Sequence, residues 1–344
     1  MLVVENQASL AHDPRWVFHL GGETYRTRDV PSRVDVIRRH LEKDPRFEFI
    51  APRRFPQKRI HQLHPYADWI KNTSRSLTDP AVEIYPDLFP GEGANLPRKK
   101  SDPLWGGLWC TDAVTPIKMR TYDAAKHSAE TALTAAKLVA DGKDREVYAM
   151  CRPSGHHAGP RVFGGYCYFN NCVLAADLLA GKGTVATLDI DFHHGNGTQE
   201  FFQSDPRVFT ASIHADPSVE YPYFWGYTNE RGIDDGEGTN RNFPLPLGAT
   251  AEEYLRAVDK AARAIRSFGP DFLVISAGFD THKDDPIGGF ALDQRVYPEI
   301  GKRLAKLGVP TTICQEGGYR GRTLGGCVHA FLSGFLNGRD DTKN

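Results

Sequence analysis

Residues 184–195 read Thr-Val-Ala-Thr-Leu-Asp-Ile-Asp-Phe-His-His-Gly. The apolar, β-prone run predicts a buried strand, and polar residues follow at its carboxyl end. Alternate residues of an extended chain face the same way, so Asp191 and His193 are predicted to point at one position. Asp280, at the end of the stretch Ser276–Asp280, would be a distant third ligand. Three protein ligands leave the fourth position of a tetrahedral metal ion open for water, as in catalytic sites.

Bulk properties exclude several classes of protein. The 344 residues are enough for one large or two smaller α/β domains, and the formal charge of −1 provides no basic surface for nucleic acid. No apolar run approaches the roughly 20 residues of a membrane span, and the first residues do not resemble a secretion signal. We therefore expect a cytoplasmic protein that binds neither nucleic acid nor membrane. Its six cysteines form no C-x-x-C pair and are expected to be reduced and mostly buried.

Short apolar runs alternate with longer helical patterns, which is typical of a mostly parallel sheet with helices on both faces. Strands are expected at Trp16–Leu20, Phe47–Ala51, Glu146–Met150, Thr184–Ile190, Val208–Ile213, Phe272–Ser276 and Pro310–Cys314. Helices are expected at Ser32–Glu42, Thr121–Ala140, Asn170–Leu179, Gly197–Ser204, Thr250–Phe268, Leu292–Leu307 and Thr323–Leu336. The fold class is therefore α/β, with three α/β/α layers.

Each of the five later strands runs into a polar segment that carries glycine or histidine. These segments are 152–157, 189–195, 214–216, 278–280 and 315–319. Ligands of parallel α/β sheets bind outside the carboxyl ends of the strands, so the five segments are predicted to converge on one active site.

Residues 74–116 differ from the rest of the chain, because they are rich in proline, glycine and charge and show little periodicity. A loop of this length inside a compact domain is unusual and favours a functional or interface role. The alternative is a solvated excursion of the surface. We expect one domain over 1–344 that includes this insertion.

Two further motifs carry groups for catalysis. His156 and His157 follow Gly155 in a turn, where one imidazole can act as a general base if its second nitrogen is held by a partner. Asp189 and Asn196 are the candidate partners, although Asp189 alternatively caps a turn. Tyr319 follows two glycines, and its phenol can donate a hydrogen bond to a developing oxyanion.

Together these motifs resemble the histone deacetylase superfamily, which has an arginase-like fold. The resemblance covers roughly residues 15–337. Within the superfamily, the length, the insertion and the segment Phe224-Trp225-Gly226 are most similar to the bacterial acetylpolyamine amidohydrolases. The motifs that carry it, in order, are Pro153–Ala158, Gly164–Asn171, Asp189–Gly197, Ser276–Asp280 and Glu316–Tyr319.

The resemblance implies roles for individual residues. Zinc would be held by Asp191, His193 and Asp280, although this donor set could also accept Fe²⁺ or Co²⁺. His157 would be the general base and later proton donor that activates water for attack on an amide, and His156 would give electrostatic support. Tyr319 would polarise the carbonyl.

The resemblance also implies monovalent cation sites and a substrate tunnel. Structural potassium would be bound by oxygen atoms of Asp189, Asp191, His193, Ser212 and Ile213. A second monovalent site would involve Phe202, Asp205 and Val208. Gly165, Tyr166 and Phe224 would form the walls of a narrow tunnel, the alternative for the aromatic residues being core packing.

Two departures place the chain within the superfamily. Gly195 stands where arginases carry an additional aspartate, which argues against a binuclear manganese site. Asn196 stands where animal nuclear deacetylases have aspartate, and an amide partner lowers the pKa of His157 relative to a carboxylate partner.

The substrate expected from this resemblance is an acetylated polyamine or short diamine, such as acetylputrescine or acetylcadaverine. Its distal amine is a cation, so Glu92, Asp102 and Asp112 are candidate contacts, with Asp112 favoured; the alternative is solvated surface charge. The resemblance places the insertion near the mouth of the active site, where it would also build a homodimer. Two other functions stay open: a protein acetyl-lysine deacetylase and a non-catalytic protein that binds acetylated amines.

Overall fold

The computed structural model describes residues 1–5, 7–18, 24–90 and 105–340. Eight strands form one sheet in the order β4-β1-β5-β10-β9-β6-β7-β8, and every neighbouring pair is parallel. The strands of this sheet are β1 (Leu2–Glu5), β4 (Glu48–Ile50), β5 (Glu146–Met150), β6 (Val185–Asp189), β7 (Val208–Ala215), β8 (Asn240–Leu245), β9 (Phe272–Ala277) and β10 (Thr311–Gln315).

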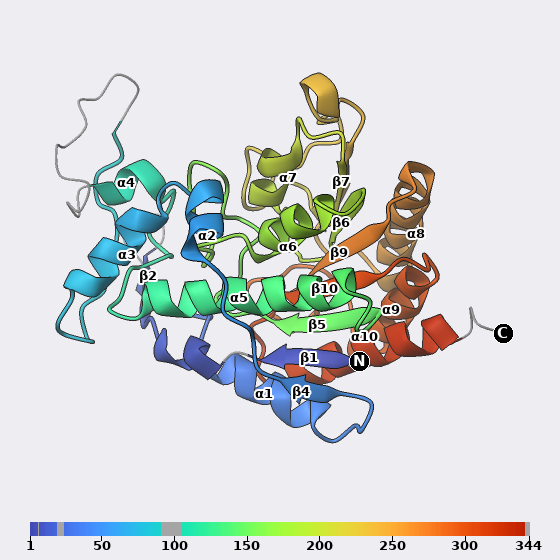
Figure 1. Cartoon of the computed structure of the whole chain (residues 1–344), viewed down its shortest axis with the longest axis horizontal. Helices are drawn as coiled ribbons and strands as arrows, with labels where there is room; N and C mark the ends of the chain where they lie inside the picture. The colour runs from blue at the N-terminus through green and yellow to red at the C-terminus, as the bar shows by residue number, and fades with distance from the viewer. Residues whose placement is uncertain (6, 19–23, 91–104, 341–344) are drawn as a thin grey trace.

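Helices cover both faces of the sheet and complete the three layers that the sequence predicts (Figure 1). On one face α5 and α6 pack together, and on the other α10 packs against α1 and α9, while α8 contacts α9 and β7. The helices are α1 (Ser32–Leu41), α2 (Gln57–Leu63), α3 (Ala67–Ser76), α4 (Gly106–Trp109), α5 (Thr121–Ala140), α6 (Asn171–Ala180), α7 (Asn196–Phe202), α8 (Ala251–Phe268), α9 (Tyr297–Ala305) and α10 (Leu324–Asp340). No helix in the described ranges is long and apolar enough to cross a membrane.

Helix α8 shows how local sequence sets these elements. Thr250 and Glu253 form a reciprocal capping box at its start, and Gly269 ends it in the left-handed conformation at φ 70°. Its buried residues recur at helical spacing and form the stripe that packs on the sheet. They are Tyr254, Ala257, Val258, Ala261, Ala262 and Ile265.

The predicted elements agree closely with the structure, with a few corrections. The ranges predicted for β5 and α5 are those observed. Trp16–Leu20 was expected beside the other strands, but Trp16–Phe18 (β2) instead pairs antiparallel with Thr24–Arg26 (β3) outside the main sheet. The expected helix from Leu292 begins as a short 3₁₀ turn, and its α-helical part is Tyr297–Ala305. The sequence reading missed β1, β3, β8, α2, α3 and α4.

The described residues of the insertion at 74–116 include regular elements. Helix α3 runs into it, α4 lies near its end, and Ile84 pairs with Ile117 through an isolated antiparallel bridge. Glu92 and Asp102, two of the three candidate amine contacts, lie outside the described residues.

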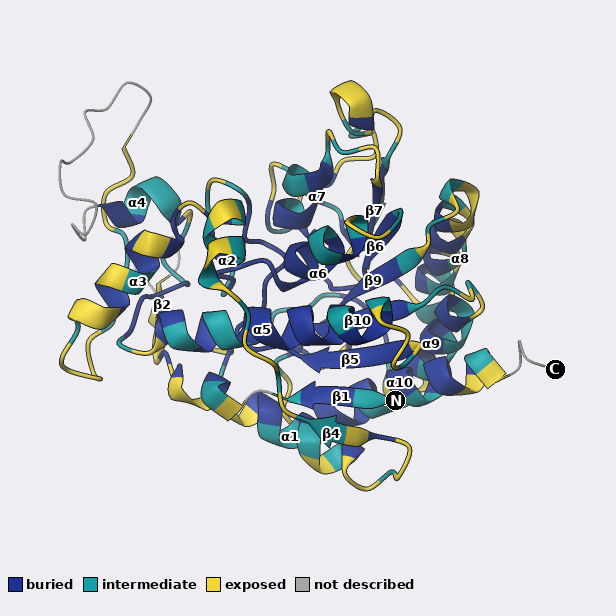
Figure 2. Cartoon of the chain, in the orientation of Figure 1, coloured by how far each residue is buried: buried dark blue, intermediate teal, exposed yellow. Residues whose placement is uncertain are grey.

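The central strands are buried on both faces (Figure 2), because helices cover each side of a parallel sheet. All six cysteines are free and buried, which confirms the expectation of buried thiols. Strands β5, β10, β9, β6 and β7 occupy adjacent positions in the sheet. Their carboxyl ends therefore bring together the five polar segments that the sequence places far apart.

Candidate active site

Asp191, His193 and Asp280 meet at the carboxyl edge of the sheet. The first two follow β6, and Asp280 follows the neighbouring strand β9, whose Ser276 is in register with Asp189. One side-chain ligand atom from each of the three residues lies within 4.8 Å of the other two. The Nδ1 atom of His193 lies 3.3 Å from Asp191 Oδ1 and 3.2 Å from Asp280 Oδ2. The three side chains therefore lie together as expected, although Asp191 and His193 lie in the bend after β6 and not in an extended strand.

Backbone amides hold the two carboxylates in place. The Phe192 amide donates to Asp280 Oδ1 at 2.9 Å, and the Gly317 amide donates to Asp191 Oδ2 at 2.8 Å. A Cβ atom on Gly317 would lie 2.5 Å from Asp191 Oδ2 and 2.4 Å from Asp280 Oδ2. Glycine at position 317 therefore allows the loop after β10 to close over the carboxylates.

The electrostatics of this cluster favour a bound cation. Burial and the neighbouring Asp191 carboxylate raise the pKa of Asp280 to about 7. Burial opposes charge on His193, but hydrogen bonds to Asp191 and Asp280 outweigh it and raise its pKa to about 10. Two buried carboxylates at one position need positive charge, and carboxylate with imidazole is a donor set that divalent metals accept. The residues present therefore fit a divalent metal ion.

We predict that the affinity of this site for a divalent metal falls as the pH falls. Below its raised pKa, His193 carries a proton on the nitrogen that would bind the metal, so binding must release that proton. Affinity should fall about tenfold per pH unit for each proton displaced. Protein freed of metal with a chelator is titrated calorimetrically with Zn²⁺ at pH 6 and pH 8, in buffers of different ionisation enthalpy. The titrations measure the affinity for Zn²⁺ and the number of protons released on binding. An affinity independent of pH would contradict the assignment.

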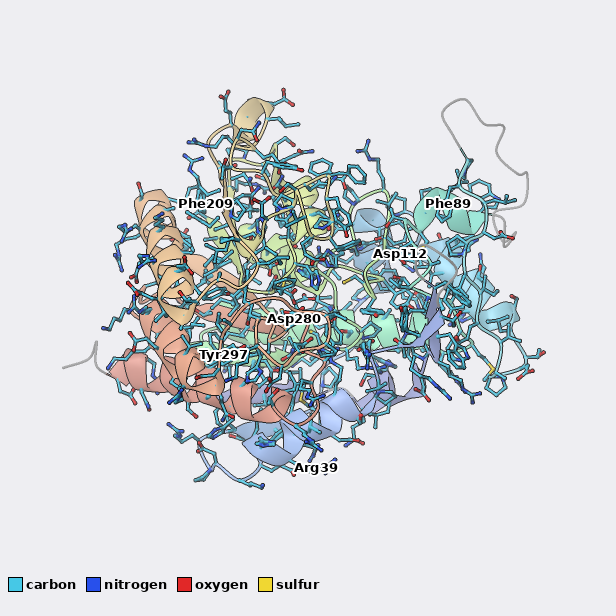
Figure 3. The ribbon with its side chains drawn as sticks, turned by 180° about the vertical axis from the view of Figure 1, so that it is seen from behind. Arg39, Phe89, Asp112, Phe209, Asp280 and Tyr297 are labelled. Carbon is cyan, nitrogen blue, oxygen red and sulfur yellow. The ribbon has the colours of Figure 1, made fainter. Side chains whose placement is uncertain are left out.

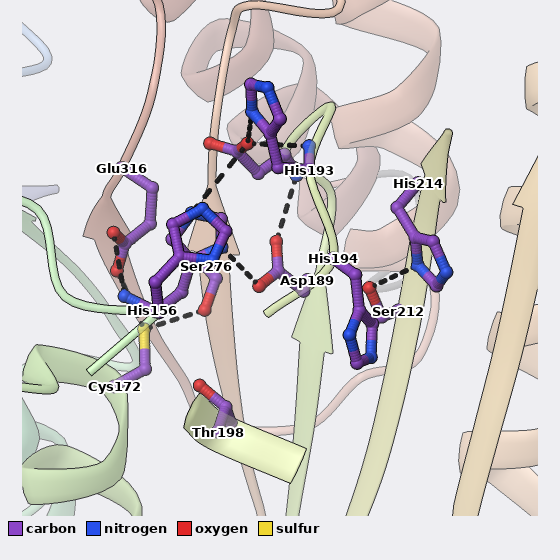
Figure 4. A network of polar contacts seen from close by, with 12 residues as sticks. His156, Cys172, Asp189, His193, His194, Thr198, Ser212, His214, Ser276 and Glu316 are labelled. Atoms are coloured by element: carbon purple, nitrogen blue, oxygen red, sulfur yellow. Dashed lines mark hydrogen bonds and ion pairs between the residues drawn. The ribbon is translucent and has the colours of Figure 1, made fainter. Parts of the chain in front are cut away.

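The tandem histidines are held by different partners. His156 Nδ1 lies 2.9 Å from Asp189 Oδ2, as Figure 4 shows, and His157 Nδ1 lies 2.8 Å from Asn196 Oδ1. These are the partners expected from the sequence. An amide oxygen and a carboxylate only accept hydrogen bonds, so both Nδ1 atoms carry the proton. When His157 is neutral, its Nε2 atom is therefore free to accept a proton.

The two imidazoles differ in charge. Burial opposes protonation of His156, but the carboxylates of Asp191 and Asp189 outweigh it and raise its pKa well above the ordinary value. Burial, together with the neighbouring His156 and His193, lowers the pKa of His157 well below the ordinary value. One charged and one neutral histidine lie side by side, with ring centroids 3.9 Å apart. Neighbouring histidines whose pKa values are shifted in opposite directions suit distinct electrostatic and acid–base roles.

Glu316 and Asn170 hold the turn that carries the two histidines, and sequence reasoning did not assign either residue a role. The Gly155 amide donates to Glu316 Oε2 at 2.7 Å, and Asn170 Nδ2 donates to the Ala158 carbonyl at 3.0 Å. Burial raises the pKa of Glu316 to about 7. Their only signal in the sequence is that each lies inside a motif, next to a residue of more obvious chemistry.

Tyr319 lies on the loop after β10, with its ring centroid 5.7 Å from that of Tyr166. Burial raises the pKa of its phenol well above the ordinary value, so the group stays protonated and can donate. Arg33, a residue that sequence reasoning missed, donates to the carbonyls of Glu316 at 2.6 Å and Gly318 at 2.7 Å. Its guanidinium lies 4.6 Å from the Tyr319 ring centroid, so Arg33 fixes the loop and the ring together.

Aromatic rings border the histidines. Tyr221, which the sequence reading overlooked, stands perpendicular to His157 with ring centroids 4.8 Å apart, and its ring lies 6.1 Å from that of His193. A Cβ atom on Gly165 would lie 2.3 Å from His157 Cδ2, so the Gly165–Tyr166 backbone closely approaches this histidine. Phe224 is 84 % exposed, and its place in a tunnel wall stays a prediction.

The remaining predicted residues fall at two places. Ser212 is in register with Asp189 on the adjacent strand, and its hydroxyl lies 2.7 Å from His214 Nδ1 (Figure 4). Potassium at this edge remains a prediction, as does the second monovalent site.

Asp112 is partly buried, and its Oδ2 atom accepts a hydrogen bond from the Gly165 amide at 2.6 Å. The structure thus places Asp112 against the Gly165 backbone, which closely approaches His157.

Comparisons with known proteins agree with this geometry. A model of the histone deacetylase domain matches residues 27–335. Acetylpolyamine amidohydrolase 1 of Pseudomonas aeruginosa is 40 % identical over 305 residues, which is 86 % of this chain and 88 % of that protein. Histone deacetylase 8 of Arabidopsis thaliana is 35 % identical over 89 % of this chain and 81 % of its own length. A crystal structure of acetylpolyamine aminohydrolase from Burkholderia pseudomallei superposes with a TM-score of 0.90 at 34 % identity, covering 97 % of this chain and 98 % of that chain.

Proposed function

Because the chain belongs to the histone deacetylase family, we propose that it is a zinc-dependent amidohydrolase that removes acetyl groups from acetylated polyamines or short diamines. The observation that most strongly supports this proposal is the buried cluster of Asp191, His193 and Asp280 next to the neutral His157. The chain that carries this cluster is 40 % identical to an acetylpolyamine amidohydrolase. The alternative of a non-catalytic binding protein leaves the paired histidines and Tyr319 without a purpose.

The family implies a divalent metal, and Asp191, His193 and Asp280 would hold it. A bound divalent ion supplies Lewis acidity, which lowers the pKa of water and polarises a carbonyl oxygen. We propose zinc, while the carboxylate-rich donor set also suits Fe²⁺ or Co²⁺. The potassium sites remain a separate prediction.

The protein's own groups supply the proton transfers. His157 Nε2 accepts the proton of the attacking water, because its Nδ1 proton is committed to Asn196. The same imidazole then gives that proton to the leaving amine. The charge on His156 stabilises the negative charge that develops on the substrate, and the Tyr319 phenol donates to the carbonyl oxygen.

Turnover of matched substrates tests the proposal. We expect metal-reconstituted protein to cleave N-acetylputrescine and N-acetylcadaverine rapidly and an acetyl-lysine peptide slowly, with no cleavage after chelation. The comparison with histone deacetylase 8 of Arabidopsis thaliana supports a protein deacetylase as the second candidate. A preference for the peptide would establish that second function, and absence of any cleavage would overturn the proposal.

Asn196→Asp is predicted to move the acidic limb of the pH profile to higher pH. A carboxylate beside His157 Nδ1 stabilises the protonated imidazole and raises its pKa by roughly 1–3 units. Less of the neutral base is then present at a given pH, so kcat/KM should fall first below neutrality. The profile of kcat/KM from pH 5 to 9 measures the shift. Identical acidic limbs in the variant and the parent would remove His157 as the titrating base.

We also propose a single-domain homodimer in which the insertion lies near the entrance. Light scattering at micromolar protein should give twice the mass of the chain. A monomer under these conditions would contradict the dimer without affecting the proposed chemistry. Contact between Asp112 and the substrate amine also remains a prediction.

A further inference from the structure

We propose that the segment Trp109–Thr115 is a positioning element, in which Asp112 fixes the Gly164–Tyr166 wall against His157 and so sets the efficiency with which slender amides are cleaved. The inference rests on the proposed deacetylase function. It gives Asp112 a role different from that of a counter-ion for the substrate. The segment lies near α4, toward the side of the molecule where Figure 3 labels Asp112 and Phe89.

Two stretches of chain are joined residue by residue along this wall. The Phe163 amide donates to the Trp109 carbonyl at 2.7 Å, and the Thr111 amide donates back to the Phe163 carbonyl at 2.9 Å. Farther along, the Gly165 amide donates to Asp112 Oδ2 at 2.6 Å and the Tyr166 amide to Thr115 Oγ1 at 3.0 Å. The last two acceptors are side chains, so the wall depends on the identity of residues 112 and 115.

The wall has a backbone conformation that needs such support. Gly165 has φ 57° and Tyr166 has φ 66°, and a non-glycine residue in this left-handed region is uncommon and costs energy. The space for the wall is also narrow. A Cβ atom on Gly164 would lie 2.6 Å from Asp112 Oδ2, while one on Gly165 would lie 2.3 Å from His157 Cδ2. Movement of the wall toward or away from His157 is therefore limited by Asp112.

Both oxygens of Asp112 already have protein donors. Oδ1 accepts the Val114 amide at 2.9 Å, and Oδ2 accepts the Gly165 amide. Burial raises the pKa of this carboxyl group despite these bonds. Because both carboxylate oxygens accept hydrogen bonds from backbone amides, the group is placed to hold a loop.

The same segment also reaches the second aromatic border of the site. The Thr111 side chain lies close enough to the phenol of Tyr221 to offset part of the rise in its pKa that burial causes, and the Tyr221 ring packs perpendicular to His157. Residues 111–115 thus contact both the Gly164–Tyr166 wall and Tyr221. A loosened segment should therefore disturb the surroundings of the general base without touching the metal ligands.

Paired variants and paired substrates separate positioning from charge recognition. Asp112→Asn keeps an oxygen that can accept the Gly165 amide but removes the charge, and Asp112→Ala removes both. The substrates are cationic N-acetylputrescine and N-pentylacetamide, in which a methyl group replaces the distal ammonium. Positioning predicts that Asp112→Ala loses about tenfold in kcat/KM on both substrates and that Asp112→Asn restores most of it. The exposed Asp87→Ala serves as the matched control.

An amine contact predicts the opposite pattern, in which both variants lose activity equally and only on N-acetylputrescine. That outcome would overturn the inference and establish the amine contact instead. Retention of full activity on both substrates by Asp112→Ala would overturn both roles.

Hydrogen exchange measured by mass spectrometry tests the wall directly. Peptides that contain Gly165 and Tyr166 should exchange at least tenfold faster in Asp112→Ala than in the parent protein. In Asp112→Asn their exchange rate should return toward that of the parent. The exchange rate of the β10 peptide should be the same in all three proteins. If Asp112→Ala does not fold, Thr115→Val removes the acceptor of the Tyr166 amide and serves instead. Should the parent protein cleave neither substrate, the proposed function fails while exchange still decides the inference. Unchanged exchange at Gly165 and Tyr166 would overturn it.

Discussion

His157→Ala is expected to lower kcat on N-acetylputrescine by about a thousandfold, because general acid–base catalysis contributes roughly 10²–10⁴ in rate. His157 is the one histidine of the pair whose pKa is lowered by burial and by positive neighbours, so it is neutral near pH 7. Its Nδ1 atom is held by Asn196, which leaves Nε2 for the substrate side. Steady-state kinetics at saturating substrate measure the loss.

The matched control for this variant is His329→Ala, on α10, where the imidazole pairs with Asp44. It should change kcat less than twofold. Metal content per chain should be the same in both variants, since neither removes a proposed ligand. A His157→Ala protein with full metal and unchanged kcat would remove His157 as the base.

Tyr319→Phe is expected to lower kcat by about 10²–10³, the loss typical of removing one donor to a developing oxyanion. The substitution removes only the phenolic oxygen, so the ring stays between Arg33 and Tyr166. Because the lost hydrogen bond strengthens as negative charge develops on the carbonyl oxygen, kcat should fall far more than KM rises.

Tyr148→Phe is the control, because its buried phenol donates to Gln315 in the core. It should affect stability and leave kcat within a factor of two. A Tyr319→Phe variant that raises KM alone would show that the phenol binds substrate without stabilising the transition state.

The sequence alone predicts the parts of the site that depend on strand ends. Asp191, His193 and Asp280 could be placed together because parallel strands share a carboxyl edge. Asp191 and His193 lie in the bend just after β6, so the expected alternation along an extended strand is not what brings them together. The order of the strands could not be read from the chain. That β6 lies next to β9, and β9 next to β10, results from packing between residues distant in sequence.

The misses have physical reasons as well. Strand β1 is only four residues long. Strand β8 contains Pro244, and a proline argues against assigning a central strand but is tolerated in an edge strand, which β8 is. Tyr221 and Phe224 are aromatic residues of one loop, and composition cannot tell which ring faces His157. Arg33 bonds to backbone carbonyls of a distant loop, and the bond between Asp112 and the Gly165 amide is of the same kind. Such contacts leave no pattern in a single sequence.

The most direct test of the account is the activity of chelated protein as zinc is added back. The cluster of Asp191, His193 and Asp280 predicts that cleavage of N-acetylputrescine rises in proportion to added zinc and reaches a plateau at one ion per chain. Asp280→Ala should abolish this rise while the protein stays folded. Full activity before zinc is added, or a rise that persists in Asp280→Ala, would contradict the central claim that these three residues hold the catalytic metal.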